Sequence, residues 1–494
     1  MYKSIQQFIE KDIKEIEKVL GKILTNEKDA DDLSKEVMDR AMTLSARLLG
    51  ELYEQLDDEI KKSVMRKRHW NVEQTKQTKE ILDIVGPVRF ERTGYVDKRT
   101  GKYIYLLDQV LGIEKNQKMT LGAAADVLEE SIMSSYAKGG RAASRYDAAS
   151  KQTVKNLVHK TMIQFPIAVP AERKQIRNLH IVADEDHVSA QYQYQKGDLP
   201  KDKNGRTINT IMPKLIVVYE DVINEAGDKS EHPRYKLIGK RVFSGVHKGT
   251  NANYKFWEEV RNYIECTYDT TGLERIYIAG DGASWIKAGI EVLEKSRFVL
   301  DKFHMMKYIN LSVTHLLDST EDAKEEIWEC INGANKQGIR DVYQKILAVT
   351  EKDSKKYEEV EGALRYLINN WPGIEIRKAE PGGCWKCCAE GQVSHILSDR
   401  MSSRPMGWSE HGCDQMAKLR AYHWNNGKVI DILKYQKKKK GQEEHRQEQE
   451  ELIKELRERH GRWNYAEETR ELIPGLEKHS MKWLRSMIYQ ALDA

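Results

Sequence analysis

Three short apolar segments of the sequence each end in an aspartate, and their order along the chain constrains the fold strongly. They are NLHIVAD at 178–184, RIYIAGD at 275–281 and FVLD at 298–301. A strand-like pattern continues from the first of them to residue 195. Each apolar run has the length of a strand and is far shorter than the eighteen or so residues that span a membrane. Strands are also expected at 214–222 and 235–246, and a helix follows around Phe256 and Trp257. Strands that give way to alternating helices and strands predict an α/β domain with a mixed sheet.

Helices are predicted on both sides of this domain. Apolar residues recur at spacings of three and four from Ile5 to Ile23, which is typical of an amphipathic helix, and the helical pattern continues to residue 65. A small hairpin is predicted over 84–106 with its turn at 98–102, and helices over 120–162. The two prolines of 166–175 mark a domain boundary. Residues 302–370 are predicted to be helical, 371–389 to be a loop, and a helix resumes at Glu390. The predicted division is a helical region 1–83, a hairpin and DNA-binding region 84–170, a core 171–318 and 384–434, a helical insertion 319–383, and a charged tail 435–494.

The composition describes a globular chain with only a mild positive charge. Lys and Arg number 81 and Asp and Glu 77, so the net charge is +4 and any nucleic-acid surface must be local. Hydrophobic residues at 40% and charged residues at 32% exclude a disordered polyelectrolyte. The first residues, MYKSIQQFIEKD, contain no apolar signal core, and six unevenly spread cysteines form no disulfide framework. We therefore expect a cytoplasmic protein without membrane contact.

The carboxylates that end the strands need a physical reason to be there. An isolated buried charge costs several kcal/mol unless it is solvated, paired or bound to a metal. Asp184 and Asp186 share one face of their strand, because side chains alternate. Asp281 ends its strand before Gly282, at the edge of the sheet where α/β proteins bind ligands. The alternative is a polar turn at Asp184 and a helix cap near Asp281, and Ser284 is expected to cap the next helix.

Two further acidic positions complete the set. Asp301 and His304 lie on one side of the first turn of a helix, where a cap and a surface histidine are the simpler interpretation. Glu390 opens a helical stretch, which is ordinary because the helix dipole favours an acidic residue there. Two aspartates on neighbouring strands and a glutamate on a helix, however, form the arrangement that holds two Mg²⁺ ions for phosphodiester cleavage.

A basic segment at 136–160 is the candidate DNA-binding element. It carries six basic residues against one acidic residue, Asp147, and two short helices with a break at 147–150 fit a helix-turn-helix. Ser150 is expected to cap the second helix, which exposes polar side chains near its N-terminus, from which base edges are read. The alternative is a basic, solvated helical hairpin. The candidate DNA-binding residues are Lys138, Arg141, Arg145, Lys151, Gln152, Thr153, Lys155 and Asn156.

Other features allow two interpretations each. The cysteines at 384, 387 and 388, with His411 and Cys413, have the ligand types of a zinc site, but free buried thiols are the simpler interpretation. The lysine run 437–440 is a solvated face or a contact to phosphates. Trp408 and Trp424 belong to the core or stack on an unpaired base, and the core is the simpler choice.

These motifs together resemble a known family. The series DEDH, AGDGASWIK, DKFH and EGQVSH with a following arginine and GWS is similar to bacterial insertion-sequence transposases of the ISLre type, relatives of the ISL and Mutator-like groups. The resemblance covers nearly the whole chain, including YLLDQVLGI in the N-terminal part. It implies a ribonuclease H-like mixed-sheet catalytic core with a helical insertion, preceded by an α-helical region that contains the helix-turn-helix.

The resemblance also implies a chemistry and a set of residues. Asp184 and Asp281 would be the catalytic aspartates and Glu390 the third carboxylate, all three as ligands of Mg²⁺ or Mn²⁺. Asp301 and His304 match the D-x-x-H signature of Mutator-like transposases. They would lie beside the active centre and orient DNA or a metal-bound water, which makes His304 a candidate catalytic residue. Asp186 and Asp301 are possible further metal ligands. Such enzymes hydrolyse a DNA strand at the element end and direct the freed 3′-OH against target DNA. The implied partners are double-stranded DNA, both terminal repeats and target, and further copies of the chain, at the bacterial nucleoid.

Some alternatives stay open at this stage. Asp186 competes with Asp184, and Glu380 and Glu410 compete with Glu390, because 109 residues separate Asp281 from Glu390. A structure-specific nuclease on the same core would cut DNA without joining it. A non-catalytic helix-turn-helix regulator would use the basic segment and leave the acidic residues as solvated turns.

Overall fold

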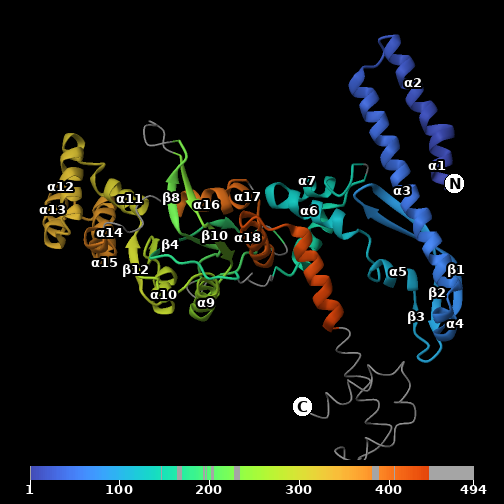
Figure 1. The fold of residues 1–494 in the computed structure, drawn as a ribbon. Helices are drawn as coiled ribbons and strands as arrows, with labels where there is room; N and C mark the ends of the chain where they lie inside the picture. The colour runs from blue at the N-terminus through green and yellow to red at the C-terminus, as the bar shows by residue number, and fades with distance from the viewer. Residues whose placement is uncertain are drawn as a thin grey trace, which may run out of the picture. The chain divides into compact units, whose positions relative to one another are not determined.

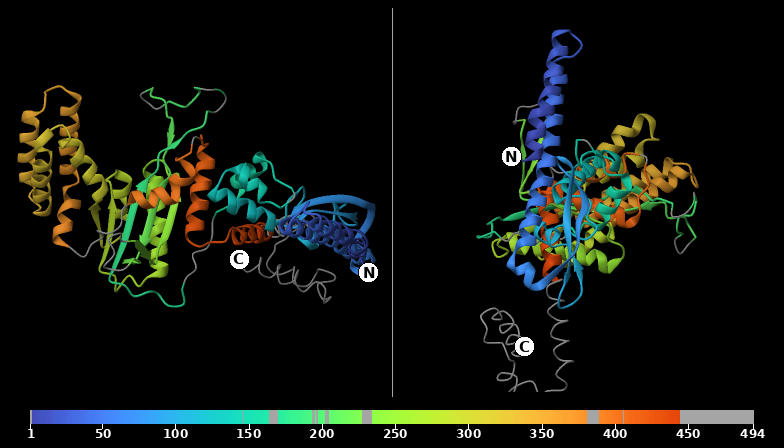
Figure 2. Two further views of the ribbon diagram at one scale, coloured as in Figure 1. Left: turned by 90° about the horizontal axis from the view of Figure 1, so that it is seen from above. Right: turned by 90° about the vertical axis from the view of Figure 1, so that its right-hand side faces the viewer.

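The computed structural model describes residues 2–443, except 146, 164–169, 193–194, 196, 202–204, 227–233, 381–388 and 405. The chain divides into two compact units, residues 1–433 and 434–494, and the fold described here is that of the first (Figures 1 and 2). No helix among the described residues is both long enough and apolar enough to cross a membrane. The predicted tail 435–494 lies mostly outside the described residues.

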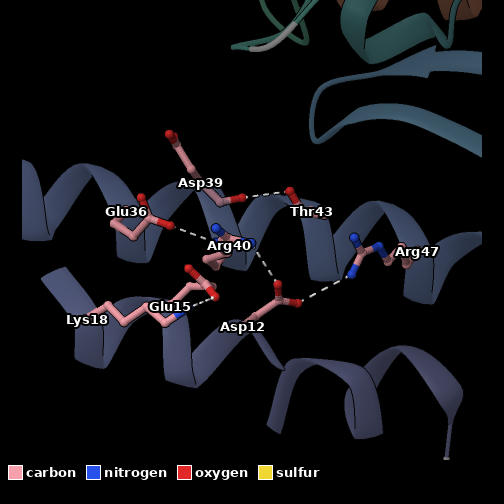
Figure 3. A network of polar contacts seen from close by, with 8 residues as sticks. All are labelled: Asp12, Glu15, Lys18, Glu36, Asp39, Arg40, Thr43 and Arg47. Atoms are coloured by element: carbon pink, nitrogen blue, oxygen red, sulfur yellow. Dashed lines mark hydrogen bonds and ion pairs between the residues drawn. The ribbon is translucent and has the colours of Figure 1, made fainter. Parts of the chain in front are cut away.

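The N-terminal region is a helical hairpin, as the periodicity predicts. Its elements are α1 (Lys3–Gln7), the π-helix η1 (Phe8–Asp12), α2 (Ile13–Leu24), α3 (Ala30–Lys62) and α4 (Val64–His69). Asp29 caps α3 in a capping box with Asp32. Asp12 is buried between two arginines of α3, with carboxylate oxygens 3.0 Å from Arg40 and 3.3 Å from Arg47 (Figure 3). A buried carboxylate needs such partners, so these ion pairs hold the π-helix η1 against α3.

A three-stranded antiparallel sheet packs on α3. Its strands are β1 (Trp70–Asp83), β2 (Gly86–Asp97) and β3 (Tyr103–Ile104). Ile81, Val88 and Phe90 form its small core. The predicted turn at 98–102 joins β2 to β3, but the long first strand is missing from the prediction and the main hairpin turns at 84–85 instead. The reason is that residues 71–78 are polar except for Val72 and almost wholly exposed, so they show no apolar alternation.

A cluster of three helices follows α5 (Leu106–Leu111). They are α6 (Leu121–Met133), α7 (Tyr136–Arg141) and α8 (Lys151–Lys160). The predicted N-cap is confirmed, because the Ser150 side chain accepts a hydrogen bond of 3.1 Å from the amide of Thr153. Gly140 lets the α7 backbone approach the chain before α8, since a Cβ at this position would collide with the carbonyl of Ala149.

The centre of the fold is a mixed five-stranded sheet, as predicted. Its order is β10-β7-β4-β11-β12. The strands are β4 (Asn178–Glu185), β7 (Lys214–Tyr219), β10 (Arg241–Gly245), β11 (Arg275–Gly280) and β12 (Ser296–Leu300). β7 runs antiparallel to both β4 and β10, whereas β11 runs parallel to both β4 and β12. The carboxyl ends of β4, β11 and β12 therefore meet at one edge.

Helices cover both faces of this sheet. One face packs on α9 (Thr250–Thr267), α10 (Ser284–Val292), α11 (Lys302–Val313) and the helices of the insertion. The insertion consists of α12 (Thr320–Asn332), α13 (Lys336–Val349), α14 (Lys355–Asn369) and α15 (Trp371–Ala379). The other face packs on α6, α16 (Ala389–Val393), the π-helix η3 (Ser394–Ser398), α17 (Asp399–Met401) and α18 (Glu410–Trp424).

Three further predictions of local structure are wrong. The strand-like stretch 178–195 contains β4, which ends at Glu185, and the separate short strand β5 (Val188–Ser189). The strand predicted at 235–246 is two strands, β9 (Tyr235–Ile238), which pairs with β8 (Asp221–Asn224), and β10. Gly239, in the left-handed region with φ +63°, separates them. Residues 371–379 form α15 and not a loop, because Pro372 occupies the first turn of a helix, where no amide donor is needed.

An acidic edge of the central sheet

The strand register places three aspartates level with one another at the carboxyl edge. Ala279 of β11 pairs with Val182 of β4 and with Val299 of β12. Two residues further along the three segments come Asp184, Asp281 and Asp301. Neighbouring strands lie about 4.8 Å apart, so the register brings the ends of all three segments together. We call these three aspartates with Glu390 the acidic edge.

Asp184 is buried near the end of β4, the strand against which α16 packs. Its side chain is 7% exposed, and one carboxylate oxygen accepts a hydrogen bond of 2.8 Å from the amide of Glu185. Burial raises the pKa of Asp184 to about 7, and the nearby carboxylates of Asp281 and Glu390 act in the same direction. Burial is the largest cause of this shift, and the charge of His304 opposes it.

Asp281 is held in a turn that the insertion supports. Its carboxylate accepts a hydrogen bond of 2.8 Å from the amide of Ala283, and Gly282 has φ +89°. The Tyr366 hydroxyl of α14 donates to the carbonyl oxygen of Asp281 at 2.7 Å. The expected cap at Ser284 is wrong, because α10 begins at Ser284 and its N-cap is Ala283 without a side-chain bond. The insertion thus helps to fix the backbone at the acidic edge.

Asp301 and His304 form a pair on the first turn of α11. Asp301, 4% exposed, caps the helix by accepting from the amides of Phe303 at 3.1 Å and His304 at 3.3 Å. It also lies 3.2 Å from Nδ1 of His304. Burial lowers the pKa of His304, but the bond to Asp301 and the charges of Asp184 and Asp281 outweigh burial and leave it raised. The imidazole is also a source of positive charge that acts to lower the pKa of Asp184.

Glu390 is brought to the same edge from a distant part of the sequence. α16 packs against β4, and Glu390 is exposed and close enough to Asp184 to contribute to its raised pKa. Glu380 instead accepts from the Tyr277 hydroxyl at 2.8 Å and pairs with Arg275 at 3.4 Å, near the amino end of β11. Glu410 pairs with Lys248 at 2.6 Å. Of the three candidates, Glu390 is thus the one whose charge acts on Asp184.

Asp186 lies just beyond the end of β4. One of its carboxylate oxygens accepts from the Ser402 hydroxyl at 3.0 Å and from the amide of His187 at 2.8 Å. Its other carboxylate oxygen is buried without a hydrogen-bond partner. Asp186 therefore joins the segment after α17 to the end of β4, which Asp184 does not.

The donor set suits a hard divalent cation, although its oxygens are not arranged as a finished ligand cage. Carboxylate oxygens are the ligands that Mg²⁺ and Mn²⁺ prefer. Among the described residues, no group of three or more His, Cys, Asp or Glu side chains is placed to hold a metal ion. The charges of Asp281 and Glu390 act on Asp184, so a cation bound among these carboxylates would offset their repulsion. Asp184, Asp281 and Glu390 fit the ion by their chemistry and require side-chain adjustment to bind it.

Two buried arginines that hold the helix of Glu390 escape prediction from the sequence. Arg400 is 1% exposed and donates to the carbonyl of Ser131 at 3.1 Å. Arg420, fully buried, donates to the carbonyls of Ile132 at 2.6 Å and His395 at 2.8 Å, and also to that of Ile396. These carbonyls belong to the last turn of α6 and to η3. The arginines thus supply donors that a helix end lacks and join α6 to the segment after Glu390.

The candidate DNA-binding residues lie at the surface of the three-helix cluster. All are exposed except Lys155, which is half-buried. Gln152 and Asn156 are bonded to each other at 2.9 Å along one side of α8, while Val154 and Val158 are buried on another. Arg145 lies 3.7 Å from Asp39 of α3. The segment therefore presents polar and basic groups to solvent on a packed support.

The remaining motifs have simple outcomes. The cysteines at 384, 387 and 388 lie outside the described residues. Cys413 is buried, and burial raises the pKa of its thiol. His411 contacts the ring of His159, with ring centroids 4.9 Å apart. Trp408 is confirmed as a core residue and donates to the carbonyl of Met401 at 3.0 Å, while Trp424 is only partly buried and packs at the margin of the same core.

The fold and the acidic edge define a mixed α/β protein with helical additions and a gathering of carboxylates at the carboxyl ends of its strands. The chain belongs to the family described as "Uncharacterised protein family (UPF0236)", which it matches over residues 23–439. Two UPF0236 proteins of Caldanaerobacter subterraneus subsp. tengcongensis are 33% and 34% identical over 418 and 419 residues. The alignments cover 85% of this chain and 84% and 83% of those proteins. The second of them carries eleven locus designations in its name.

A solved structure was also matched. It is entitled "Drosophila P element transposase strand transfer complex", and the match covers 67% of this chain and 83% of that chain at 10% identity. The TM-score of 0.19 does not establish a common fold.

Proposed function

We propose that this protein is a DDE-type transposase of the ISLre type, which cleaves DNA at the ends of an insertion sequence and joins the freed 3′-OH to target DNA. The observation that carries the proposal is the acidic edge. Two aspartates stand level on the neighbouring segments β4 and β11, and the charge of a helix-borne glutamate acts on the first of them. This is the carboxylate set that a two-metal phosphoryl transfer uses.

The sheet and the three-helix cluster support the proposal. An antiparallel β4-β7-β10 meander with parallel β11 and β12 on the other side of β4 is consistent with a ribonuclease H-like core. α7 and α8, with the Ser150 cap and exposed Gln152, Thr153 and Asn156, are consistent with a helix-turn-helix.

The relatives add a second line of support. One UPF0236 protein of C. subterraneus is named by eleven loci, and two others by four and two. A sequence that occurs at many loci of one genome is what a mobile element produces. DNA, Mg²⁺ or Mn²⁺, self-association on DNA and a location at the nucleoid follow from the proposal.

The residues of the acidic edge would divide the chemistry among them. Asp184, Asp281 and Glu390 would hold the metal ions, which when bound activate the attacking oxygen and stabilise the leaving oxygen. Asp301 orients the His304 imidazole by the 3.2 Å contact and, with Asp184, keeps its pKa raised, so that the ring can donate to a phosphate oxygen. Tyr366 holds the backbone of Asp281 from the insertion side. Residues 138–156 would bind the duplex and position its cleavage point.

The test uses the chromosomal DNA that flanks the gene as a labelled duplex, with Mg²⁺ or Mn²⁺. We expect the wild-type chain to nick this duplex near the element end, and the Asp281→Asn variant to bind it equally well without nicking. Cleavage by Asp281→Asn at the wild-type rate would refute the site. A pre-cut duplex with a free 3′-OH tests joining, because a nuclease on the same core would cut but not join. A regulator would bind but show no metal-dependent cleavage.

A further inference from the structure

A second basic surface lies outside the segment 136–160, where two separate parts of the chain meet. α4 ends at His69, and β1 begins with Trp70, which pairs with Asp97 at the end of β2. The amide of Lys98 donates to the carbonyl of His69 at 2.9 Å, and the Lys98 amine donates to the carbonyl of Lys67 at 2.7 Å. The turn between β2 and β3 is thereby fixed against α4 (Figure 1).

The meeting point gathers five exposed basic residues around a single acidic residue of the turn, Asp97. Its exposed basic residues, which we call the α4 surface, are Lys67, Arg68, Lys98, Arg99 and Lys102. Asp97 is the acid of the turn, and its carboxylate accepts from the amides of Arg99 and Thr100 at 2.8 Å each. In the part of the chain that the structure describes, none of these five residues forms an ion pair.

The backbone beneath this surface is well fixed. The Arg66 guanidinium donates to the carbonyl of Lys61 and lies over the ring of Tyr95, 6.0 Å from its centroid. Ser63 caps α4 by accepting from the amide of Arg66 at 3.2 Å. The basic side chains are therefore presented by a supported turn and helix, which reduces the ordering that a ligand must impose.

The strand that leads away from the α4 surface indicates the kind of ligand. β1 is exposed over 71–76, with hydrogen-bonding side chains at Asn71, Gln74, Thr75 and Lys76. Lysine, arginine, asparagine, glutamine and threonine are the side chains that contact phosphates and sugars along a duplex, and β-ribbons dock in its grooves. We propose that the α4 surface is a second binding site for the phosphate backbone of double-stranded DNA, separate from residues 138–156. The inference rests on the proposed function only in taking DNA as the substrate class.

The test compares two variants of the full chain with equal loss of charge. The first, K67Q/R68Q/R99Q/K102Q, removes four charges from the α4 surface. The control, R340Q/K345Q/K352Q/K355Q, removes four from exposed positions of the insertion. Binding of a 30-base-pair duplex of arbitrary sequence is measured by fluorescence anisotropy over a KCl series in EDTA, and circular dichroism shows that both variants are folded. EDTA makes the result independent of any metal at the acidic edge.

Each phosphate contact contributes about 0.9 to the slope of log K against log salt. We expect the α4 variant to lose about 3 to 4 from that slope and to bind at least about tenfold more weakly near 0.1 M KCl, while the control stays within about twofold of wild type. Equal affinities of the two variants would overturn the proposal. Val64 and Met65 are exposed beside the surface, so a membrane is the alternative ligand. The proposal would also be overturned if the wild type and the control bound phosphatidylserine vesicles, and the α4 variant lost that binding but kept its DNA affinity. If the chain showed no DNA cleavage, the proposed transposase activity would be refuted, but the DNA-binding measurement would still test the α4 surface.

Discussion

Acidic residues have different partners at the two edges of the central sheet. Near the amino end of β11, Glu380 has both a hydroxyl donor, Tyr277, and a cation, Arg275. At the carboxyl edge Asp184 is more deeply buried, has one backbone donor and an imidazole nearby, and shares its surroundings with two further carboxylates. Burial and the neighbouring carboxylates both act against the charge of Asp184, whereas the charge of Glu380 has a hydroxyl donor and a cation beside it. Under the proposed function, the carboxyl edge is the one that would bind metal ions.

The largest expected effect is on the rate of DNA cleavage, and it distinguishes Asp184 at the carboxyl edge from Glu380 near the amino end of β11. Asp184→Asn removes a proposed metal ligand and should slow metal-dependent DNA cleavage by about a thousandfold, equivalent to about 4 kcal/mol. Glu380→Gln should leave the rate within about threefold of wild type, because its partners lie at the other edge. Single-turnover cleavage of the flanking duplex measures both. Similar losses in the two variants would mean that the edges do not differ in function.

The next effect concerns what holds Glu390 in place. Arg420→Leu leaves the buried carbonyls of Ile132, His395 and Ile396 without their donor and should lower the free energy of unfolding by about 3 kcal/mol. The control Arg404→Leu, at an exposed position, should change it by less than about 0.5 kcal/mol. Urea unfolding followed by circular dichroism gives both values. An equal change in the two variants would show that Arg420 does not anchor η3 to α6.

The sequence predicts the strands of the acidic edge better than it predicts their support. The runs before Asp184, Asp281 and Asp301 are apolar because they are buried on both faces, and such runs are recognisable without a structure. β1 is not, because an exposed polar strand has no alternating pattern. The domain boundaries and the role of each acid stay predictions.

The burial of Arg400 and Arg420 could not be predicted from the sequence. The Ser131 carbonyl that Arg400 binds lies 269 residues away along the chain. Arginine is a surface residue in most contexts, so its burial depends on helix ends that only the tertiary fold brings near. The contribution of Tyr366 to the Asp281 turn is hidden for the same reason, because α14 belongs to what the sequence shows as an insertion.

A third effect is the pH dependence of stability, which tests whether the charge of Asp184 destabilises the fold when no metal ion is bound. Burial raises the pKa of Asp184 from its ordinary value of 3.8 to about 7, so the folded state resists ionisation of this group more than the unfolded state does. The resulting loss of stability is absent below about pH 4, grows as the pH rises to 7, and is constant above. In EDTA at pH 8, Asp184→Asn should therefore be about 2 kcal/mol more stable than wild type, and the difference should shrink toward pH 4. A difference that does not change with pH would contradict the raised pKa.

The smallest expected effect is the pH dependence of the Mg²⁺ affinity, because a proton and the metal ion compete for the carboxylate of Asp184. A metal ion binds the ionised form of Asp184, so binding below pH 7 must displace a proton. The affinity for Mg²⁺ should be about tenfold weaker at pH 6 than at pH 8, which is about 1.4 kcal/mol of ligand stabilisation, and should change little above pH 8. The shift of the melting temperature by a MgCl₂ series at each pH measures it, with Asp184→Asn as the control that should show a small shift at both. If wild type and Asp184→Asn respond alike to Mg²⁺ at pH 8, the ion binds elsewhere, and the contrast between the two edges has another cause.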